Sequence, residues 1–119
     1  VFADLVRGNY QSDSDLLFTV SNDAWFGDSI GPLQHMQIAR MRALELQRPL
    51  VRVTNNGVSA VYDPISHTQQ TMPQFEAATM KADIKLIQGD SVYSQYGNVF
   101  VWGFVLLMMI GGIGVRFRK

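Results

Sequence analysis

The chain has 119 residues, of which 47% are hydrophobic, with 10 basic residues, 10 acidic residues and no cysteine. This length suits one small domain with a modest core. No cluster of lysine and arginine of the kind that neutralises phosphates is visible, which argues against a nucleic-acid partner. The lack of cysteine excludes disulfides and thiolate metal sites within these residues.

Charge is distributed unevenly along the chain. All the acidic residues lie between positions 4 and 90, whereas residues 91–115 carry no charge and are followed by the basic tail RFRK. The chain begins with Val1 rather than Met, and no signal-peptide pattern follows it. We therefore interpret the sequence as a piece of a longer protein; a processed product would begin in the same way.

The first predicted element is a strand at residues 16–20 (LLFTV). Its unbroken apolar run is typical of a sheet that is covered on both faces. The segment NDAWFG at residues 22–27 follows as a turn or loop at the end of that strand. Its two aromatic residues, Trp25 and Phe26, form either a hydrophobic plug or the wall of a pocket, because ligands of α/β sheets bind beyond the carboxyl ends of strands.

A helix is predicted next. Gly31-Pro32 opens it, and an imperfect apolar stripe extends it to about Gln47. Arg42 and Glu45 are three residues apart on this helix, close enough to pair. The dipeptide Arg48-Pro49 ends the helix, since the residue before a proline avoids the α region.

Three further strands are predicted at residues 50–54, 58–62 and 82–86, the last with an alternating, half-exposed pattern. Between the first two, residues 55–57 (NNG) form a tight turn where a positive φ is expected. A strand, a helix and three more strands predict an α/β sheet rather than a helix bundle. One good helix is too little to cover it, so covering segments are expected outside this chain.

The end of the chain predicts a transmembrane helix at residues 96–115. Residues 99–115 are almost wholly apolar and would span about 26 Å as a helix, against roughly 30 Å for a hydrocarbon core. A buried core helix is the alternative, but the segment has no polar face and ends at basic residues. Because lysine and arginine beside a span stay in the cytoplasm, the tail at 116–119 is predicted cytoplasmic and residues 1–95 lie on the opposite side.

The side chains that carry chemistry form no catalytic constellation in this sequence. Ser59 lacks the glycine pattern of a nucleophile elbow. His35 and His67 have no metal-ligand spacing, so no metal site is expected. Asp23 and Asp28 flank the aromatic loop and could contact substrate, although capping and turn formation explain them equally well.

Three motifs together resemble the nitrilase superfamily: SNDAWFG at residues 21–27, GPLQH at 31–35 and ARMRALE at 39–45. The turn at residues 55–57 continues the match. The residues YSQYGN at 93–98 and the apolar end are similar to the apolipoprotein N-acyltransferase branch of that superfamily. The resemblance covers nearly the whole chain.

This resemblance implies an α/β fold, namely the C-terminal part of a nitrilase-type α-β-β-α sandwich followed by one transmembrane helix. It implies a bacterial inner-membrane protein whose soluble part is periplasmic. It also implies a Glu–Lys–Cys triad that takes an acyl chain from a phospholipid as a thioester, without a cofactor. The acyl chain then passes to the lipidated N-terminal cysteine of an apolipoprotein.

None of the triad falls on this chain. The resemblance places the cysteine a few residues before Val1 and the other two residues further upstream, in the part of the enzyme that these residues are expected to contact. The resemblance assigns supporting roles, and no catalytic role, to residues of this chain. The loop residues Asn22, Asp23, Trp25 and Phe26 are expected near substrate. A second group is expected to act as scaffold: His35, Arg42 and Glu45.

The predicted organisation is a partial carbon-nitrogen hydrolase domain at residues 1–95, a membrane helix at 96–115 and a basic tail at 116–119. Expressed alone, the chain is predicted to fold poorly and to be inactive. Two alternatives stay open. One is a non-catalytic single-pass membrane protein that binds or acts as a decoy, and the other is a membrane-anchored nitrilase-type amidase.

Overall fold

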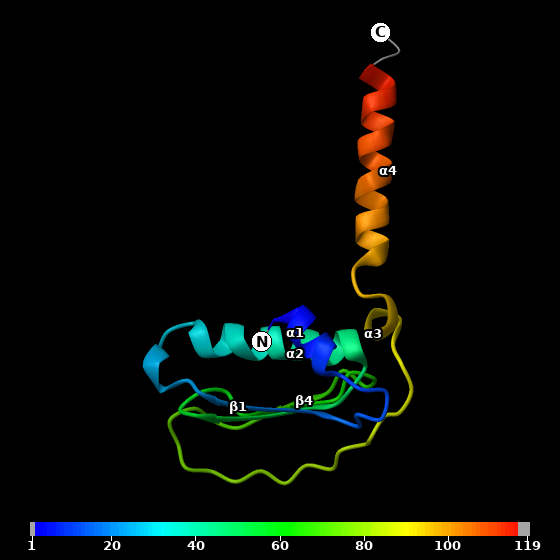
Figure 1. Ribbon diagram of the computed structural model, residues 1–119. Helices are drawn as coiled ribbons and strands as arrows, with labels where there is room; N and C mark the ends of the chain where they lie inside the picture. Colours follow the sequence, from blue (N-terminus) through cyan, green and yellow to red (C-terminus); the bar gives the residue numbers. More distant parts are fainter. Residues whose placement is uncertain (1, 117–119) are drawn as a thin grey trace.

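The computed structural model describes residues 2–116, with side chains described as far as residue 112. It has two parts, an α/β domain and a helix that projects from one end of it (Figure 1). The domain contains one mixed sheet and a layer of helices on one face of that sheet. This arrangement agrees with the α/β class predicted from the sequence.

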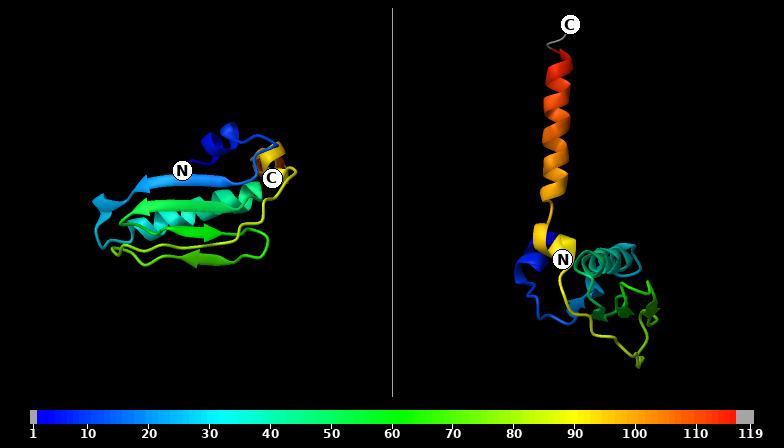
Figure 2. Two further views of the ribbon diagram at one scale, coloured as in Figure 1. Left: turned by 90° about the horizontal axis from the view of Figure 1, so that it is seen from below. Right: turned by 90° about the vertical axis from the view of Figure 1, so that its right-hand side faces the viewer.

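The sheet has four strands in the order β1-β2-β3-β4. The strands are β1 (Leu17–Asn22), β2 (Leu50–Asn55), β3 (Ala60–Tyr62) and β4 (Gln69–Thr71). β1 and β2 are parallel, whereas β3 and β4 each run antiparallel to the preceding strand, as Figure 2 shows. The predicted strands at residues 16–20 and 50–54 are confirmed within a residue or two.

The connection between the parallel strands is α2 (Gly31–Leu46), which lies on one face of the sheet (Figure 1). Its buried residues recur every three or four positions, as expected for one face of a helix: Pro32, Met36, Ala39, Ala43 and Leu46. This face packs on buried sheet residues that include Leu50, Ala60 and Tyr62. The helix ends at Gln47 in a left-handed conformation, φ 53°, just before the Arg48-Pro49 stop.

Two elements differ from the sequence predictions in the second half of the domain. β3 is shorter than the predicted strand at residues 58–62, because the Ser59 hydroxyl takes the place of a strand partner and accepts a hydrogen bond from the Thr54 amide at 2.9 Å. β4 was not predicted, since Gln69–Thr71 is polar and exposed. The turn at 55–57 is present, with Asn56 at φ 58°.

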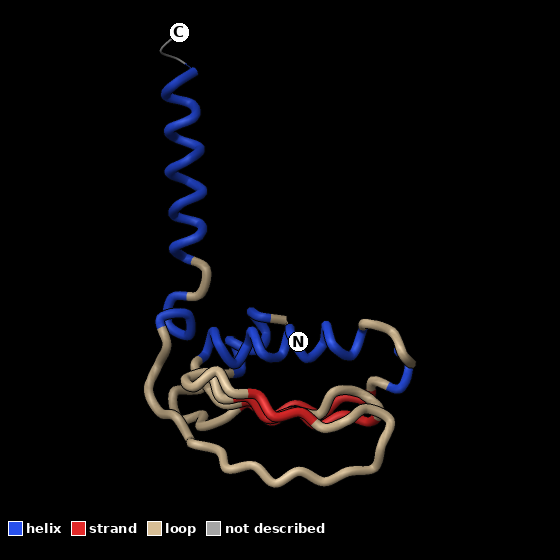
Figure 3. Tube along the Cα trace, turned by 180° about the vertical axis from the view of Figure 1, so that it is seen from behind, coloured by secondary structure: helices blue, strands red, loops and turns tan. Residues whose placement is uncertain are grey.

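The prediction of a strand at residues 82–86 is wrong. The segment between β4 and α3 (Val92–Tyr96) is a loop that passes the sheet on the side opposite α2 (Figure 3). Ile84 lines a small hollow with Val61 and Tyr62 of β3. The alternation of side chains thus follows contact with the sheet surface, and the segment has no ladder partner among the described strands.

Two short helices complete the description. α1 (Ala3–Asn9) and α3 were not predicted, because each is too short to give a helical repeat. α1 lies beside α2, and α3 lies at the base of α4 (Val99–Arg116). Residues 10–16 connect α1 to β1, and residues 27–30 connect the turn Ala24–Phe26 to α2.

The predicted transmembrane helix at residues 96–115 needs correction. Gly97 has φ 54° and ends α3, so Tyr96 and Asn98 do not extend α4 into one continuous span. Among the residues that the structure describes, no helix has the length and apolar character needed to cross a membrane. The side chains of the basic tail at 116–119 lie outside the described residues.

Candidate functional site

The parallel strands β1 and β2 end together, with Asn22 opposite Asn55. The chain leaves β1 into a single 3-10 turn, Ala24–Phe26, which crosses the edge of the sheet toward the start of α2. The side-chain oxygen of Asn22 accepts a hydrogen bond from the Ala24 amide at 3.2 Å and so shapes the beginning of this turn. The carboxyl ends of parallel strands are where α/β folds place ligands, and the aromatic loop lies there.

Asp23 is the centre of this region and is buried, with 1% of its surface exposed. One carboxylate oxygen, Oδ2, accepts a hydrogen bond from Nη2 of Arg52 at 2.9 Å. The other, Oδ1, accepts from the Ser21 hydroxyl at 2.6 Å and lies 3.4 Å from Nδ1 of His35. Residues from β1, α2 and β2 therefore meet at one carboxylate, which fixes the start of the aromatic loop.

The charge of this carboxylate is stabilised despite its burial. Burial alone would raise the pKa of Asp23, but the Ser21 hydrogen bond, the positive charge of Arg52 and the contact with His35 outweigh it and lower the pKa below its usual value. Asp23 is therefore an anion at neutral pH. We infer a structural ion pair with Arg52 rather than a proton donor.

Local sequence explains how a charged pair fits inside the domain. Arg52 is 2% exposed and sits in the middle of β2, on the face that α2 covers. Gly57, in the turn after β2, leaves the space that Asp23 occupies: a Cβ at Gly57 would lie 2.4 Å from Oδ2 of Asp23. Glycine is required here because the carboxylate approaches the backbone so closely.

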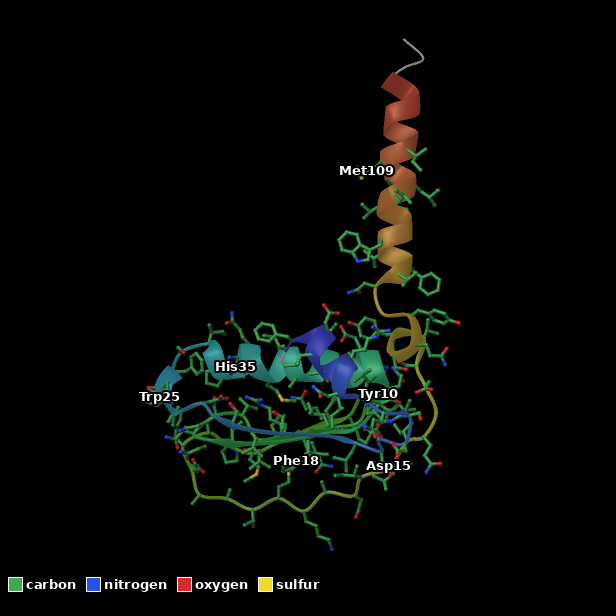
Figure 4. The ribbon with its side chains drawn as sticks, in the orientation of Figure 1. Tyr10, Asp15, Phe18, Trp25, His35 and Met109 are labelled. Carbon is green, nitrogen blue, oxygen red and sulfur yellow. The ribbon has the colours of Figure 1, made fainter. Side chains whose placement is uncertain are left out.

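The two aromatic residues of the loop have different surroundings. The Phe26 ring stands edge-on to His35, with 4.8 Å between the ring centroids, and it packs against Gly31 at the start of α2. Trp25 is 86% exposed and lies at the outer end of the domain (Figure 4). Phe26 is 38% exposed and is covered only partly, by His35 and the start of α2, whereas the indole of Trp25 is open to a partner.

A second polar cluster lies further along α2. Arg42 donates a hydrogen bond from Nη2 to Oε1 of Glu45 at 2.7 Å, as their spacing predicts. Burial raises the pKa of Glu45, the charge of Arg42 opposes that shift, and the nearby Asp4 adds to it. Glu45 is therefore the more readily protonated of the two buried or half-buried carboxylates in this part of the fold.

A cavity of about 530 Å³ lies between α2, β1 and the start of α1, and His35, Arg42 and Arg52 line it together with Thr19 and Ser21. The Nε atoms of Arg42 and Arg52 have no hydrogen-bond partner among the described residues. Both atoms are themselves buried, so they lie behind the accessible surface of the cavity wall. Phe2 and Ala3 form part of it, so it opens toward the first residues of the chain.

The remaining candidate residues do not join these clusters. The Ser59 hydroxyl is engaged with Thr54, and His67 lies in the exposed turn after β3, where Nδ1 is 3.2 Å from the Tyr62 hydroxyl. Asp28 is exposed in the loop before α2. Within the described part of the chain, no group of three or more histidine, aspartate or glutamate side chains could hold a metal ion.

Sequence reasoning missed three residues that build the Asp23 cluster. Ser21 and Gly57 were assigned to the loop motif and to the tight turn, and neither pattern predicts a contact with Asp23. Arg52 could have been found, because a lone arginine within the apolar strand LVRVTN requires a buried acceptor. Asp23, at the end of the neighbouring parallel strand, is the acceptor that such reasoning would have suggested first.

Comparison with known proteins places this geometry in a family. Residues 1–92 match the family model described as carbon-nitrogen hydrolase. A protein of Vibrio vulnificus (strain CMCP6) named apolipoprotein N-acyltransferase is 52% identical over 104 residues, which cover 86% of this chain and 21% of that protein. Proteins of the same name from Vibrio cholerae serotype O1 and Pasteurella multocida (strain Pm70) are 49% and 41% identical, covering 98% and 100% of this chain.

The chain spans only about a fifth of these relatives, 22% and 23% for the last two. The match nevertheless includes both parallel strands, the aromatic loop and the whole of α2. The mixed sheet with its covering helix fits the same fold. The chain belongs to the carbon-nitrogen hydrolase family.

Proposed function

We propose that these residues are part of an enzyme that transfers an acyl chain from a phospholipid to the N-terminal lipidated cysteine of an apolipoprotein. The observation that carries this proposal is the identity of 41–52% with proteins named apolipoprotein N-acyltransferase, over 86–100% of the chain. The reaction is proposed for the longer protein, because this chain contains no cysteine and therefore not the expected nucleophile.

Within that enzyme, the Asp23 cluster is proposed to act as the rigid base of the aromatic loop. A buried ion pair with hydrogen bonds from Ser21 and Arg52 holds the start of the loop. Residues that lock a loop by packing and hydrogen bonding make its exposed side chains better oriented for binding. Trp25 is the side chain so presented, and we propose that it contacts the acyl chain or the acceptor.

The same enzyme is proposed to lie at the bacterial inner membrane, with the α/β domain in the periplasm and the C-terminus in the cytoplasm. Exposed apolar side chains run along α4 from Val99 to Ile110, which favours contact with lipid. The basic residues that follow in the sequence favour a cytoplasmic end. α4 is the segment that we propose to contact lipid.

The test of the activity uses the full-length protein in vesicles of phosphatidylethanolamine and phosphatidylglycerol. The acceptor is a peptide whose N-terminal cysteine carries a diacylglyceryl group and a free amine. The expected result is a peptide heavier by one acyl chain. Hydrolysis of a small carboxamide with no change in the peptide would favour the amidase, and binding of the peptide without any product would favour the non-catalytic protein.

The role of Trp25 is tested with Trp25→Ala in the same assay. We expect kcat/KM for acyl transfer to fall about 10- to 100-fold, the size of effect that misplacing a bound substrate produces. Ile65→Ala is the matched control, because Ile65 is also a large exposed apolar residue but lies on the turn after β3. Equal kinetics for both variants and the parent would remove Trp25 from the substrate site.

A further inference from the structure

The junction between the α/β domain and α4 is short. α3 ends at Tyr96 and α4 begins at Val99, so only Gly97 and Asn98 separate the two helices. The way in which α3 is held therefore bears on the direction in which α4 leaves the domain. Figure 1 and Figure 2 show α3 at the base of α4, beside the helical layer of the domain.

Arg7 of α1 holds the end of α3. Its Nε donates to the carbonyl oxygens of Tyr93 at 3.1 Å and Ser94 at 3.0 Å, and its Nη2 donates to that of Gln95 at 2.9 Å. The last carbonyls of a helix lack partners within the helix and carry partial negative charge. The planar guanidinium donates to three of these carbonyls from two of its nitrogen atoms, a geometry that the ammonium group of lysine does not reproduce. The Tyr93 carbonyl also accepts a hydrogen bond from the Gly97 amide at 2.8 Å.

Gly97 is fitted to this contact. It ends α3 with φ 54°, and a Cβ placed on it would lie 2.9 Å from Cζ and 3.0 Å from Nη1 of Arg7. The guanidinium thus lies directly against the backbone of the junction. The three carbonyl contacts and the close approach to Gly97 both describe one position of the Arg7 guanidinium, at the point where α4 turns away.

Two more contacts hold α3 against the domain. The Ser91 hydroxyl donates to the carbonyl oxygen of Glu45 near the end of α2 at 2.6 Å, and it accepts from the Ser94 amide at 3.0 Å. Just before α3, the carbonyl oxygen of Gly89 accepts hydrogen bonds from the buried Arg48 and from the Tyr10 hydroxyl. α3 is therefore fixed to α1 and α2 on two sides.

We propose that Arg7 is a positioning residue that sets the direction of α4 relative to the α/β domain. This inference rests on the proposed function, in which α4 contacts lipid. Under that function, the direction of α4 determines how the helical layer and the aromatic loop stand above the lipid surface. Arg7 then acts through α3, without contact to substrate.

The direction of α4 can be measured without any assay of activity. In the full-length protein in vesicles, two residues are replaced by a keto amino acid to which a spin label is attached. These residues are Gln37, which is exposed on α2, and Leu107, which is 70% exposed on α4. We expect one narrow distribution of label-to-label distances in the parent, a broad one in Arg7→Ala and an intermediate one in Arg7→Lys. Arg40→Ala is the control, because Arg40 is a half-buried arginine that lies over Tyr62 instead of α3. A narrow distribution in Arg7→Ala would overturn the proposal.

A variant of Gly97 tests the same contact between Arg7 and the junction from the side of the glycine. Gly97→Ala is expected to broaden the distance distribution as Arg7→Ala does, whereas Gly103→Ala, with nothing within 4 Å, is expected to leave it unchanged. A narrow distribution in Gly97→Ala would contradict the fit between Gly97 and Arg7.

A separate measurement tests whether the direction of α4 affects acyl transfer. Transfer to a lipid-embedded acceptor is expected to fall about 10- to 100-fold in Arg7→Ala, whereas acylation of the enzyme by a water-soluble short-chain ester is expected to stay unchanged. A broad distance distribution with unchanged transfer would overturn this link. If the parent protein transfers no acyl chain, the proposed function fails, while the distance measurement still decides whether Arg7 sets the direction of α4.

Discussion

Two arginines from neighbouring positions in the sequence, Arg48 and Arg52, hold opposite ends of the domain with different kinds of partner. Both are buried, with 1% and 2% of their surfaces exposed. Arg52 binds a carboxylate, Asp23, at the carboxyl ends of the parallel strands. Arg48 binds neutral acceptors: the hydroxyl of Tyr10 at 2.6 Å and the carbonyl oxygens of Gln47 and Gly89.

This difference determines what each end of the domain tolerates. The charge of Arg52 is neutralised by a single ionised partner, so removal of that partner leaves a buried charge without compensation. The charge of Arg48 is shared among several dipoles and the Tyr10 ring, whose centroid is 5.3 Å from Cζ of Arg48. Loss of one of these partners leaves the others in place. The aromatic-loop end therefore depends on one ion pair, and the α3 end depends on many weaker contacts.

The largest effect is expected for Asp23→Ala. This change removes the only carboxylate that Arg52 contacts among the described residues, and breaking a buried pair in this way costs about 3–5 kcal/mol. The measurement is thermal unfolding of the full-length protein in detergent. Asp23→Leu combined with Arg52→Met should recover much of the loss, because it removes both charges. Equal loss in the single and double variants would show that the pair is not the source of the effect.

A smaller effect is expected for Gly57→Ala. The added methyl group would lie 2.4 Å from Oδ2 of Asp23, and the backbone must shift to admit it, at a cost of about 1–3 kcal/mol. Gly8→Ala is the control, because Gly8 lies in α1 with nothing within 4 Å and alanine favours helix. If the two variants unfold at the same temperature, the close packing of Asp23 against the turn is wrong.

At the α3 end, Tyr10→Phe tests whether the loss of one partner of Arg48 has only a small effect on the free energy of unfolding. It removes one hydroxyl acceptor of Arg48 and one donor to Gly89, and we expect a loss of only about 0.5–1.5 kcal/mol, the value of an ordinary hydrogen bond. Urea unfolding of the full-length protein provides the measurement. A loss as large as that of Asp23→Ala would mean that the two ends do not differ in this respect.

The smallest effect is the acid dependence of the Asp23 cluster, because burial opposes the hydrogen bonds and the charge of Arg52. The pKa of Asp23 is lowered by folding, so its contribution to stability is present above the unfolded pKa of about 4 and is lost as pH falls through the folded value. Unfolding temperatures between pH 6 and pH 3 should therefore fall more steeply for the parent than for the Asp23→Leu, Arg52→Met variant. Parallel curves would contradict the lowered pKa.

The elements that the sequence predicts well are those whose apolar residues form a regular pattern within the element itself. α2 has buried residues at helical spacing, and residues 16–20 and 50–54 are apolar runs that end at polar turns, so both strands and the helix were found. β4 escaped prediction because QQT has no apolar side chain, and its pairing with β3 comes from the turn between them. Residues 82–86 alternate like a strand because Ile84 rests on the sheet, but no strand of the described sheet pairs with them.

The candidate site shows the same division. The pair of Arg42 and Glu45 follows from helix geometry and was predicted. The pair of Asp23 and Arg52 joins a residue just after β1 to one within β2, 29 positions away. The lone arginine in β2 indicates that a buried acceptor exists, but which acceptor it meets depends on the register of β1 and β2. The motif SNDAWFG identified the loop through resemblance, but only the structure distinguishes the partly covered Phe26 from the exposed Trp25.

The contacts of Arg7 also determine the order in which the protein can fold. β1, α2 and β2 are adjacent in the sequence, so their contacts close short loops and can form early. Arg7 reaches partners 86 to 88 residues away, in a helix near the end of the chain. The sheet and α2 can therefore assemble before α3 is in place. The contact between Arg7 and α3 closes a much longer loop, so we expect it to form after the sheet and α2.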